Sequence, residues 1–286
     1  MAKGAAVNEY FTKQKLQELD QDITDRDRHI LKSLQNCRYL TTLQIARLYC
    51  GQSINKRAAV RAADRSLTRL RDHNLIRSLQ RRIGGVRAGS GSFVWALTPS
   101  GFKLLQLRAA DNPQRKFFRE PTLHFMTHTL VISEAWLQLH EICCKNNMTL
   151  ARVQFEPDCW RWYTTKGGRK AVLKPDLYAV TQGGGYEDCW FIEIDCDTET
   201  IARVMDKCDR FLEYLRTGAE QKQTGVFPNV VWIVPDEKRK NSVLKHLRMQ
   251  YPHDQNVFLV ILPDELEPLI TGGAAEYIKR VRVDSG

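Results

Sequence analysis

The sequence predicts an α+β protein with two domains, and three observations lead to this expectation. Its 286 residues are enough for two modest hydrophobic cores. Residues 1–121 hold 23 Lys and Arg but 10 Asp and Glu, whereas residues 122–286 hold 20 and 23. Helical periodicity dominates the first part, and short apolar runs alternate with amphipathic segments in the second. We expect a polar arm at 1–22, a first domain at 23–115, a second domain at 120–270 and a tail at 271–286.

Two helices are predicted at the start of the first domain. Thr24 is a suitable N-cap for a helix whose apolar positions run from Ile30 to Cys37 at helical spacing. A second helix opens after Tyr39, and its apolar positions lie between Leu43 and Leu48. A polar segment that begins at Cys50 separates this helix from the next.

The third predicted helix, from about Asn55 to Asp72, has one apolar and one basic face. Its apolar stripe runs from Val60 through Ala63 and Leu67 to Leu70, and the basic positions lie well over 90° away at 100° per residue. Arginine suits phosphate oxygens and guanine edges because its planar group donates two parallel hydrogen bonds. The residues expected to contact DNA from this helix are Lys56, Arg57, Arg61, Arg65, Thr68 and Arg69.

A β-hairpin is predicted after the third helix. Residues 75–79 and 93–97 show strand patterns, and the Gly-rich segment 84–91 connects them. Arg81, Arg82 and Arg87 make this hairpin a basic wing, and a further helix starts at Thr98. Three helices followed by a basic hairpin are typical of a winged helix-turn-helix domain, which predicts duplex-DNA binding. A winged helix that binds protein is the alternative.

The second domain is expected to form an α/β core. A long apolar helix is predicted over residues 121–144, and amphipathic helices over 198–215 and 236–250. The expected strands cover residues 150–155, 172–180, 189–195, 230–234 and 257–261.

Three carboxylates stand near the ends of two of these strands. Glu193 and Asp195 are two residues apart, so they share one face of the sheet, and Asp176 joins them if the two strands pair as a hairpin. Such oxygen ligands suit Mg²⁺ or Mn²⁺, which can activate water against a phosphodiester. The sequence thus proposes Asp176, Glu193 and Asp195 as metal ligands.

The order of these motifs resembles a known family. Pro175-Asp176 followed by Glu193 and Asp195 has the outline of the PD-(D/E)xK nuclease fold. With a basic winged helix ahead of it, the chain resembles the replication-relaxation family of mobile-element proteins. The motifs that carry the resemblance are Leu97–Gly101, Lys174–Leu177 and Phe191–Asp195, followed by a helix with Lys207 and Tyr214.

The resemblance implies duplex-DNA binding in the replication, relaxation or conjugative transfer of a mobile element. It also implies Asp176, Glu193, Asp195 and Lys207 as catalytic residues of a nuclease. The nuclease pattern has Lys two residues after its Glu, where this chain has Asp195; Lys207 or Lys174 would have to replace it. Whether the chain is an enzyme therefore stays open. The alternatives are a Mg²⁺-dependent endonuclease guided by the winged helix and a transcriptional regulator whose second domain dimerises or binds a partner.

Other features bear on location and partners. The eight cysteines are scattered without a CxxC pair, and no apolar run approaches the ~18 residues of a membrane span, so we expect a cytoplasmic protein with free thiols. Expected partners are double-stranded DNA, a relaxase or replication initiator, and a second copy of the chain. His124 and His128 have zinc-like spacing without a third ligand. The segment Trp160–Tyr163 suits either a base-stacking hairpin or an ordinary one.

Overall fold

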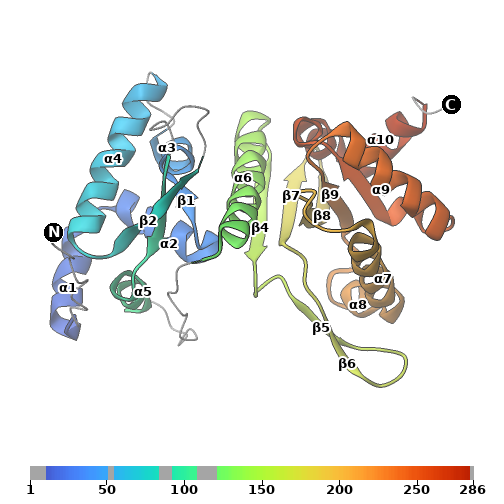
Figure 1. Cartoon of the computed structure of the whole chain (residues 1–286), viewed down its shortest axis with the longest axis horizontal. Helices are drawn as coiled ribbons and strands as arrows, with labels where there is room; N and C mark the ends of the chain where they lie inside the picture. The colour runs from blue at the N-terminus through green and yellow to red at the C-terminus, as the bar shows by residue number, and fades with distance from the viewer. Residues whose placement is uncertain (1–10, 51–54, 84–91, 108–120, 284–286) are drawn as a thin grey trace. The chain divides into compact units, whose positions relative to one another are not determined.

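The computed structural model describes residues 11–50, 55–83, 92–107 and 121–283, which belong to two compact units (Figure 1). Unit 1 is Met1–Ser133 and unit 2 is Glu134–Gly286. The division lies inside helix α6 (Leu123–Lys145), downstream of the junction that the sequence placed between residues 115 and 120. Helices and strands occur in both units, which confirms the α+β class. Within the described ranges, no helix is both long enough and apolar enough to span a membrane.

Unit 1 contains the helices and the hairpin that the sequence predicted. Its elements are α1 (Lys13–Asp22), α2 (Asp25–Cys37), β1 (Leu40–Thr41), α3 (Thr42–Cys50), α4 (Lys56–Asp72), β2 (Ile76–Ile83), β3 (Ser92–Leu97) and α5 (Pro99–Gln106). Much of the expected polar arm is the helix α1, which buries Leu16 and Leu19. The loop between α3 and α4 and the tip of the hairpin lie outside the described residues.

Side-chain caps set the starts of the helices in unit 1. Thr24 and Asp27 form a reciprocal capping box at α2, and the Asn55 side chain accepts a hydrogen bond from the Ala58 N–H at α4. Thr98 caps α5, and its hydroxyl also donates to the Asn74 carbonyl at 2.6 Å. Gly101 lies so close to the residue before β2 that a Cβ there would be 2.1 Å from the Leu75 carbonyl oxygen. The Leu97–Gly101 motif is therefore a cap followed by a close backbone approach.

A small sheet completes unit 1. Its order is β1-β3-β2, with both pairs antiparallel. The apolar side of the hairpin, Leu79, Val94 and Ala96, packs against Met126 and Leu130 from the first half of α6. Gln44 of α3 also donates to the Leu130 carbonyl. The beginning of α6 is thus part of the core of unit 1.

Unit 2 is built on a five-stranded mixed sheet. Its strands are β4 (Thr149–Phe155), β7 (Leu177–Gly183), β8 (Tyr186–Ile194), β9 (Asn229–Ile233) and β10 (Phe258–Ile261), in the order β10-β9-β8-β7-β4. The pairs β8–β9 and β9–β10 are parallel, and the pairs β7–β8 and β4–β7 are antiparallel. The helices are the second half of α6, α7 (Ile201–Thr217), α8 (Ala219–Thr224), α9 (Glu237–Gln250) and α10 (Leu266–Val283), with short 3-10 turns at Gln255–Val257 and Pro263–Glu265.

The strand expected at 172–180 is two strands. Residues 170–173 are β6 (Lys170–Leu173), which pairs with β5 (Arg161–Thr164) in a separate two-stranded sheet, and β7 starts only at Leu177. Pro175 lies at the break, where it has no N–H for a ladder hydrogen bond. In Figure 1 the β5–β6 hairpin projects away from the five-stranded sheet.

The expected tail at 271–286 is also corrected. Residues 271–283 belong to α10, where Ala274 and Tyr277 are buried. The helix is interrupted at Gly273, whose φ of 74° is one that side-chain-bearing residues rarely adopt.

One face of the large sheet packs on α7 and α9. Phe191 of β8 and Trp232 of β9 are buried there with Phe211 of α7 and Val243 of α9. Because strand side chains alternate, Glu193 lies on the same face as Phe191 and points into this helical layer.

Candidate functional site

Helix α4 presents a basic face to the outside of unit 1. Its inner side buries Ala59, Ala63, Leu67 and Leu70. Five of the six residues that the sequence assigned to DNA contact on this helix are exposed: Lys56, Arg57, Arg61, Arg65 and Thr68. No described residue forms an ion pair with Arg57, Arg61 or Arg65, whose four-residue spacing places them along one side of the helix.

Arg69 differs from the other arginines of this helix. Its guanidinium donates to both carboxylate oxygens of Asp27, with its NH2 nitrogen 2.7 Å from Oδ2 and 2.8 Å from Oδ1. Asp27 is fully buried and also accepts from the Thr24 N–H and hydroxyl in the capping box. Arg69 therefore joins α4 to the start of α2, and its expected contact with DNA stays a prediction.

The predicted wing is described only at its base. Arg81 and Arg82 lie in β2, but their side chains are outside the described part of the structure, as is all of Arg87. Their expected contact with DNA stays a prediction.

Asp176 and Glu193 meet at the end of the β7–β8 pair in unit 2. Leu177 pairs with Ile192, so the residue before β7 lies beside the last residues of β8. The Asp176 carboxylate accepts a hydrogen bond from the Ile194 N–H at 2.8 Å. This confirms that the two strands form a hairpin that places Asp176 next to Glu193.

Glu193 is paired with Lys207, as the sequence anticipated for a lysine on the following helix. The Lys207 Nζ is 3.0 Å from Glu193 Oε2 and 3.4 Å from Glu199 Oε2. Burial and the adjacent Asp176 raise the pKa of Glu193 to about 8, although Lys207 acts in the opposite direction. Burial lowers the pKa of Lys207, but Glu193, Asp176 and Glu199 outweigh this and raise it. Both side chains therefore keep their protons up to a higher pH than they would in the unfolded chain.

Asp195 belongs to a separate ion pair. The Arg239 Nε of α9 donates to Asp195 Oδ2 at 2.7 Å, and the Asp197 N–H donates to Oδ1 at 2.8 Å. Arg239 also donates to the Glu199 carbonyl and contacts the Asp197 carboxylate at 3.2 Å. Arg239 was missed by the sequence reasoning because it follows Asp195 by 44 residues, and no local spacing links the two.

The three carboxylates have separate partners in the structure. Glu193 is bound by Lys207, Asp195 by Arg239, and Asp176 by the backbone of β8. Among the described residues, no group of three or more His, Cys, Asp or Glu side chains is arranged to hold a metal, and this applies also to the pair His124 and His128. Glu193 and Asp195 thus form two separate acid–base pairs, and the expected Mg²⁺ or Mn²⁺ site at Asp176, Glu193 and Asp195 stays a prediction.

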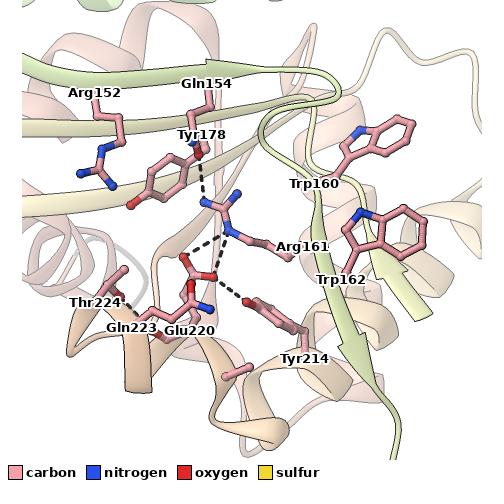
Figure 2. A pocket seen from close by; sticks show the side chains of 11 residues that line it. Arg152, Gln154, Trp160, Arg161, Trp162, Tyr178, Tyr214, Glu220, Gln223 and Thr224 are labelled. Atoms are coloured by element: carbon pink, nitrogen blue, oxygen red, sulfur yellow. Dashed lines mark hydrogen bonds and ion pairs between the residues drawn. The ribbon is translucent and has the colours of Figure 1, made fainter. Parts of the chain in front are cut away.

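Another buried ion pair lies in a pocket of unit 2. Figure 2 shows Arg161 of β5 extending toward Glu220 of α8 and Gln154 of β4. The Arg161 Nε is 3.0 Å from Glu220 Oε2, and its NH2 nitrogen is 3.1 Å from Gln154 Oε1. Tyr214 donates to Glu220 at 2.6 Å. The pocket has a volume of about 330 Å³.

Comparison with known proteins identifies one family. The model of the replication-relaxation family matches residues 31–230, which include α4, the hairpin, the acidic strands and α7. No curated protein matches the chain. The family match covers more than half of the sequence and suggests a role in the replication or relaxation of mobile elements. The chain therefore belongs to the replication-relaxation family.

Proposed function

We propose that unit 1 is a winged-helix domain that binds duplex DNA, and that the protein acts through this domain on the DNA of a mobile element. The observation that carries the proposal is the row Arg57, Arg61 and Arg65 on α4, which is exposed while the opposite side of the helix is buried. A helix of this kind fits the major groove.

The distribution of charge supports the same proposal. All of the positive excess lies in unit 1, because residues 122–133 contain no charged side chain and unit 2 holds 23 acidic against 20 basic residues. Nucleic-acid contact is thus favoured at one end of the chain.

Unit 2 is proposed to be a scaffold without nuclease chemistry. Lys207 and Arg239 occupy carboxylates that the resemblance to a nuclease would assign to a metal ion. With its acids paired in this way, the sheet offers a stable core rather than an open ligand set.

Duplex binding is tested by fluorescence anisotropy on the full-length protein. We expect a log–log salt slope of several units, because each neutralised phosphate contributes about 0.9. Replacing both Arg61 and Arg65 by Ala is expected to weaken binding by about 1–3 kcal/mol per residue where each reaches a base edge. If they contact phosphate instead, the double variant lowers the salt slope by about two.

The matched control is Arg203→Ala, which removes an exposed arginine of α7 in unit 2. It should bind duplex DNA like the wild type. Binding that is independent of salt, or an equal loss in Arg203→Ala and the α4 variant, would contradict the assignment of α4 as the recognition helix.

A further inference from the structure

The β5–β6 hairpin of unit 2 has an inner and an outer face with different chemistry. Tyr163 and Leu173 are buried and belong to the core beside α7, and Arg161 is directed inward to Glu220. The alternate residues of β5 lie on the other side, and Figure 2 shows the indoles of Trp160 and Trp162 extending away from Arg161. The buried contacts of Tyr163 and Leu173 therefore come from the inner face of the hairpin.

Exposed aromatic and basic side chains make up that outer face. The Trp162 side chain is 71% exposed, a large apolar surface for a residue that the core does not need. Trp160 is held in place, because its Nε1 donates to Glu156 and the Lys174 ammonium lies over its ring, 4.1 Å from the centroid. Thr164 pairs with Lys170 in the register, which puts Lys170 on the same face as Trp162.

The charge of this segment has one sign. Residues 159–175 contain five basic residues and no Asp or Glu. Four of them are exposed and form no ion pair with any described residue: Lys166, Arg169, Lys170 and Lys174. The fifth, Arg161, is the one that Glu220 binds. An anionic partner could therefore contact four cations that form no ion pair with described residues, on the hairpin that carries the exposed Trp162.

We propose that the outer face of the β5–β6 hairpin binds single-stranded DNA, with an unpaired base stacked on Trp162 and phosphates bound by Lys170 and Lys174. An indole face can stack on an unpaired base, and the nearby cations can bind the phosphates of the backbone. A duplex does not fit as well, because stacking within the helix covers the faces of its bases. The inference is independent of the duplex-binding role proposed for α4.

The experiment uses full-length protein and a fluorescein-labelled oligothymidylate of about 12 nucleotides, a length within the range that single-strand-binding folds cover. Trp162→Ala is expected to weaken binding about 5- to 150-fold, and Trp162→Phe to restore much of it, because stacking persists on a smaller ring. The double variant Lys170→Ala/Lys174→Ala should lower the log–log salt slope by about 1.4, because each phosphate contact on a single strand contributes about 0.7.

Two matched controls separate this face from general surface effects. Tyr186→Ala removes a residue that is 79% exposed at the turn between β7 and β8, at the other end of these strands from Leu177. Lys245→Ala removes an exposed lysine of α9. Both should bind the oligothymidylate like the wild type. All variants should keep the wild-type melting temperature, since none removes a buried side chain.

The same protein samples are titrated with the oligothymidylate annealed to oligoadenylate. Loss of single-strand binding in Trp162→Ala with retained duplex binding supports the proposal, and the reverse pattern is expected for the α4 double variant. Absence of single-strand binding by the wild type, wild-type affinity in Trp162→Ala, or an equal loss in Tyr186→Ala would overturn it. A change in sedimentation of Trp162→Ala without loss of single-strand affinity would also overturn it, because the face would then bind a second copy of the chain.

Discussion

Arg65 and Arg69 lie one helical turn apart on α4, yet their surroundings differ completely. Arg65 is exposed and no described residue pairs with it, whereas Arg69 binds a fully buried carboxylate at 2.7 Å. A guanidinium that already donates to both oxygens of Asp27 has few N–H groups left for DNA. We therefore expect replacement of Arg69 to affect stability and replacement of Arg65 to affect DNA binding.

Arg69→Ala is expected to lower the free energy of unfolding by about 3 kcal/mol, because it leaves the Asp27 charge buried without its partner. We take the lower end of the usual range since the Arg69 side chain is itself 40% exposed and screened by water. Urea unfolding followed by circular dichroism measures the change, with Arg65→Ala as the control that should leave the midpoint in place. An unfolding midpoint that is unchanged in Arg69→Ala would disprove the structural role.

Glu193 should make stability depend on pH. Its pKa rises from an ordinary value of 4.5 to about 8 in the folded protein, so the folded state holds this proton more tightly than the unfolded chain. The resulting stabilisation is fully present below pH 4.5 and is lost as the pH rises through about 8. One pKa unit corresponds to about 1.4 kcal/mol, so the loss is at most a few kcal/mol.

The measurement is the free energy of unfolding from pH 5 to 9, compared between wild type and Glu193→Gln. The amide does not titrate, so the variant should show the flatter profile over this range. If the two profiles were parallel, the raised pKa of Glu193 would not be the cause of the pH dependence.

At the scale of the element, α5 shows how a short motif sets a helix start. Thr98 supplies the cap, Pro99 occupies the first turn without needing an N–H partner, and Gly101 lets the helix approach the Leu75 carbonyl. Glycine is required here because a Cβ would clash with this carbonyl, and not because the backbone has a positive φ.

Gly101→Ala is expected to destabilise the protein by about 1–3 kcal/mol or more, because its Cβ would lie 2.1 Å from a backbone oxygen and α5 or β2 must move. The control is Gly272→Ala in α10, where the nearest atom is 3.9 Å away and alanine is the better helix former. Thermal unfolding should show a lower melting temperature for the first variant and no loss for the second. Equal melting temperatures would mean that α5 does not approach β2 this closely.

At the scale of the whole molecule, the position of the unit boundary has a consequence for truncation. Met126 and Leu130 of α6 are buried against the hairpin, although they follow the junction that composition suggested near residue 115. A fragment that ends at residue 115 exposes Leu79 and Val94, which this helix covers.

We expect residues 1–133 to be more stable than residues 1–115 by roughly 3–6 kcal/mol as an upper estimate, from the burial of two large apolar side chains. Urea unfolding of the two fragments tests this. In the longer fragment, Met126→Ala/Leu130→Ala should reproduce the loss, whereas Val131→Ala, at an exposed position, should not. Equal midpoints for the two fragments would place the end of unit 1 before α6.

The sequence by itself determined the features that depend on neighbouring residues. Periodicity and caps predicted α2, α4 and the β2–β3 hairpin, because helix and strand patterns repeat within a few residues. The same alternation placed Glu193 and Asp195 on one face of the sheet, and the uneven charge located the basic part of the chain. The extent of α10 was missed because nothing in the composition of 271–286 marked a helix that packs on a core.

Only the tertiary structure decided which charges meet. Arg69 and Asp27 are 42 residues apart, and Arg239 and Asp195 are 44 apart, so no spacing rule joins them. These pairings tie Arg69 to the start of α2 and divide the three carboxylates between two cations and the backbone. The physical reason is that a buried charge must be matched by whatever group the fold brings within about 3 Å, and that group comes from a distant element.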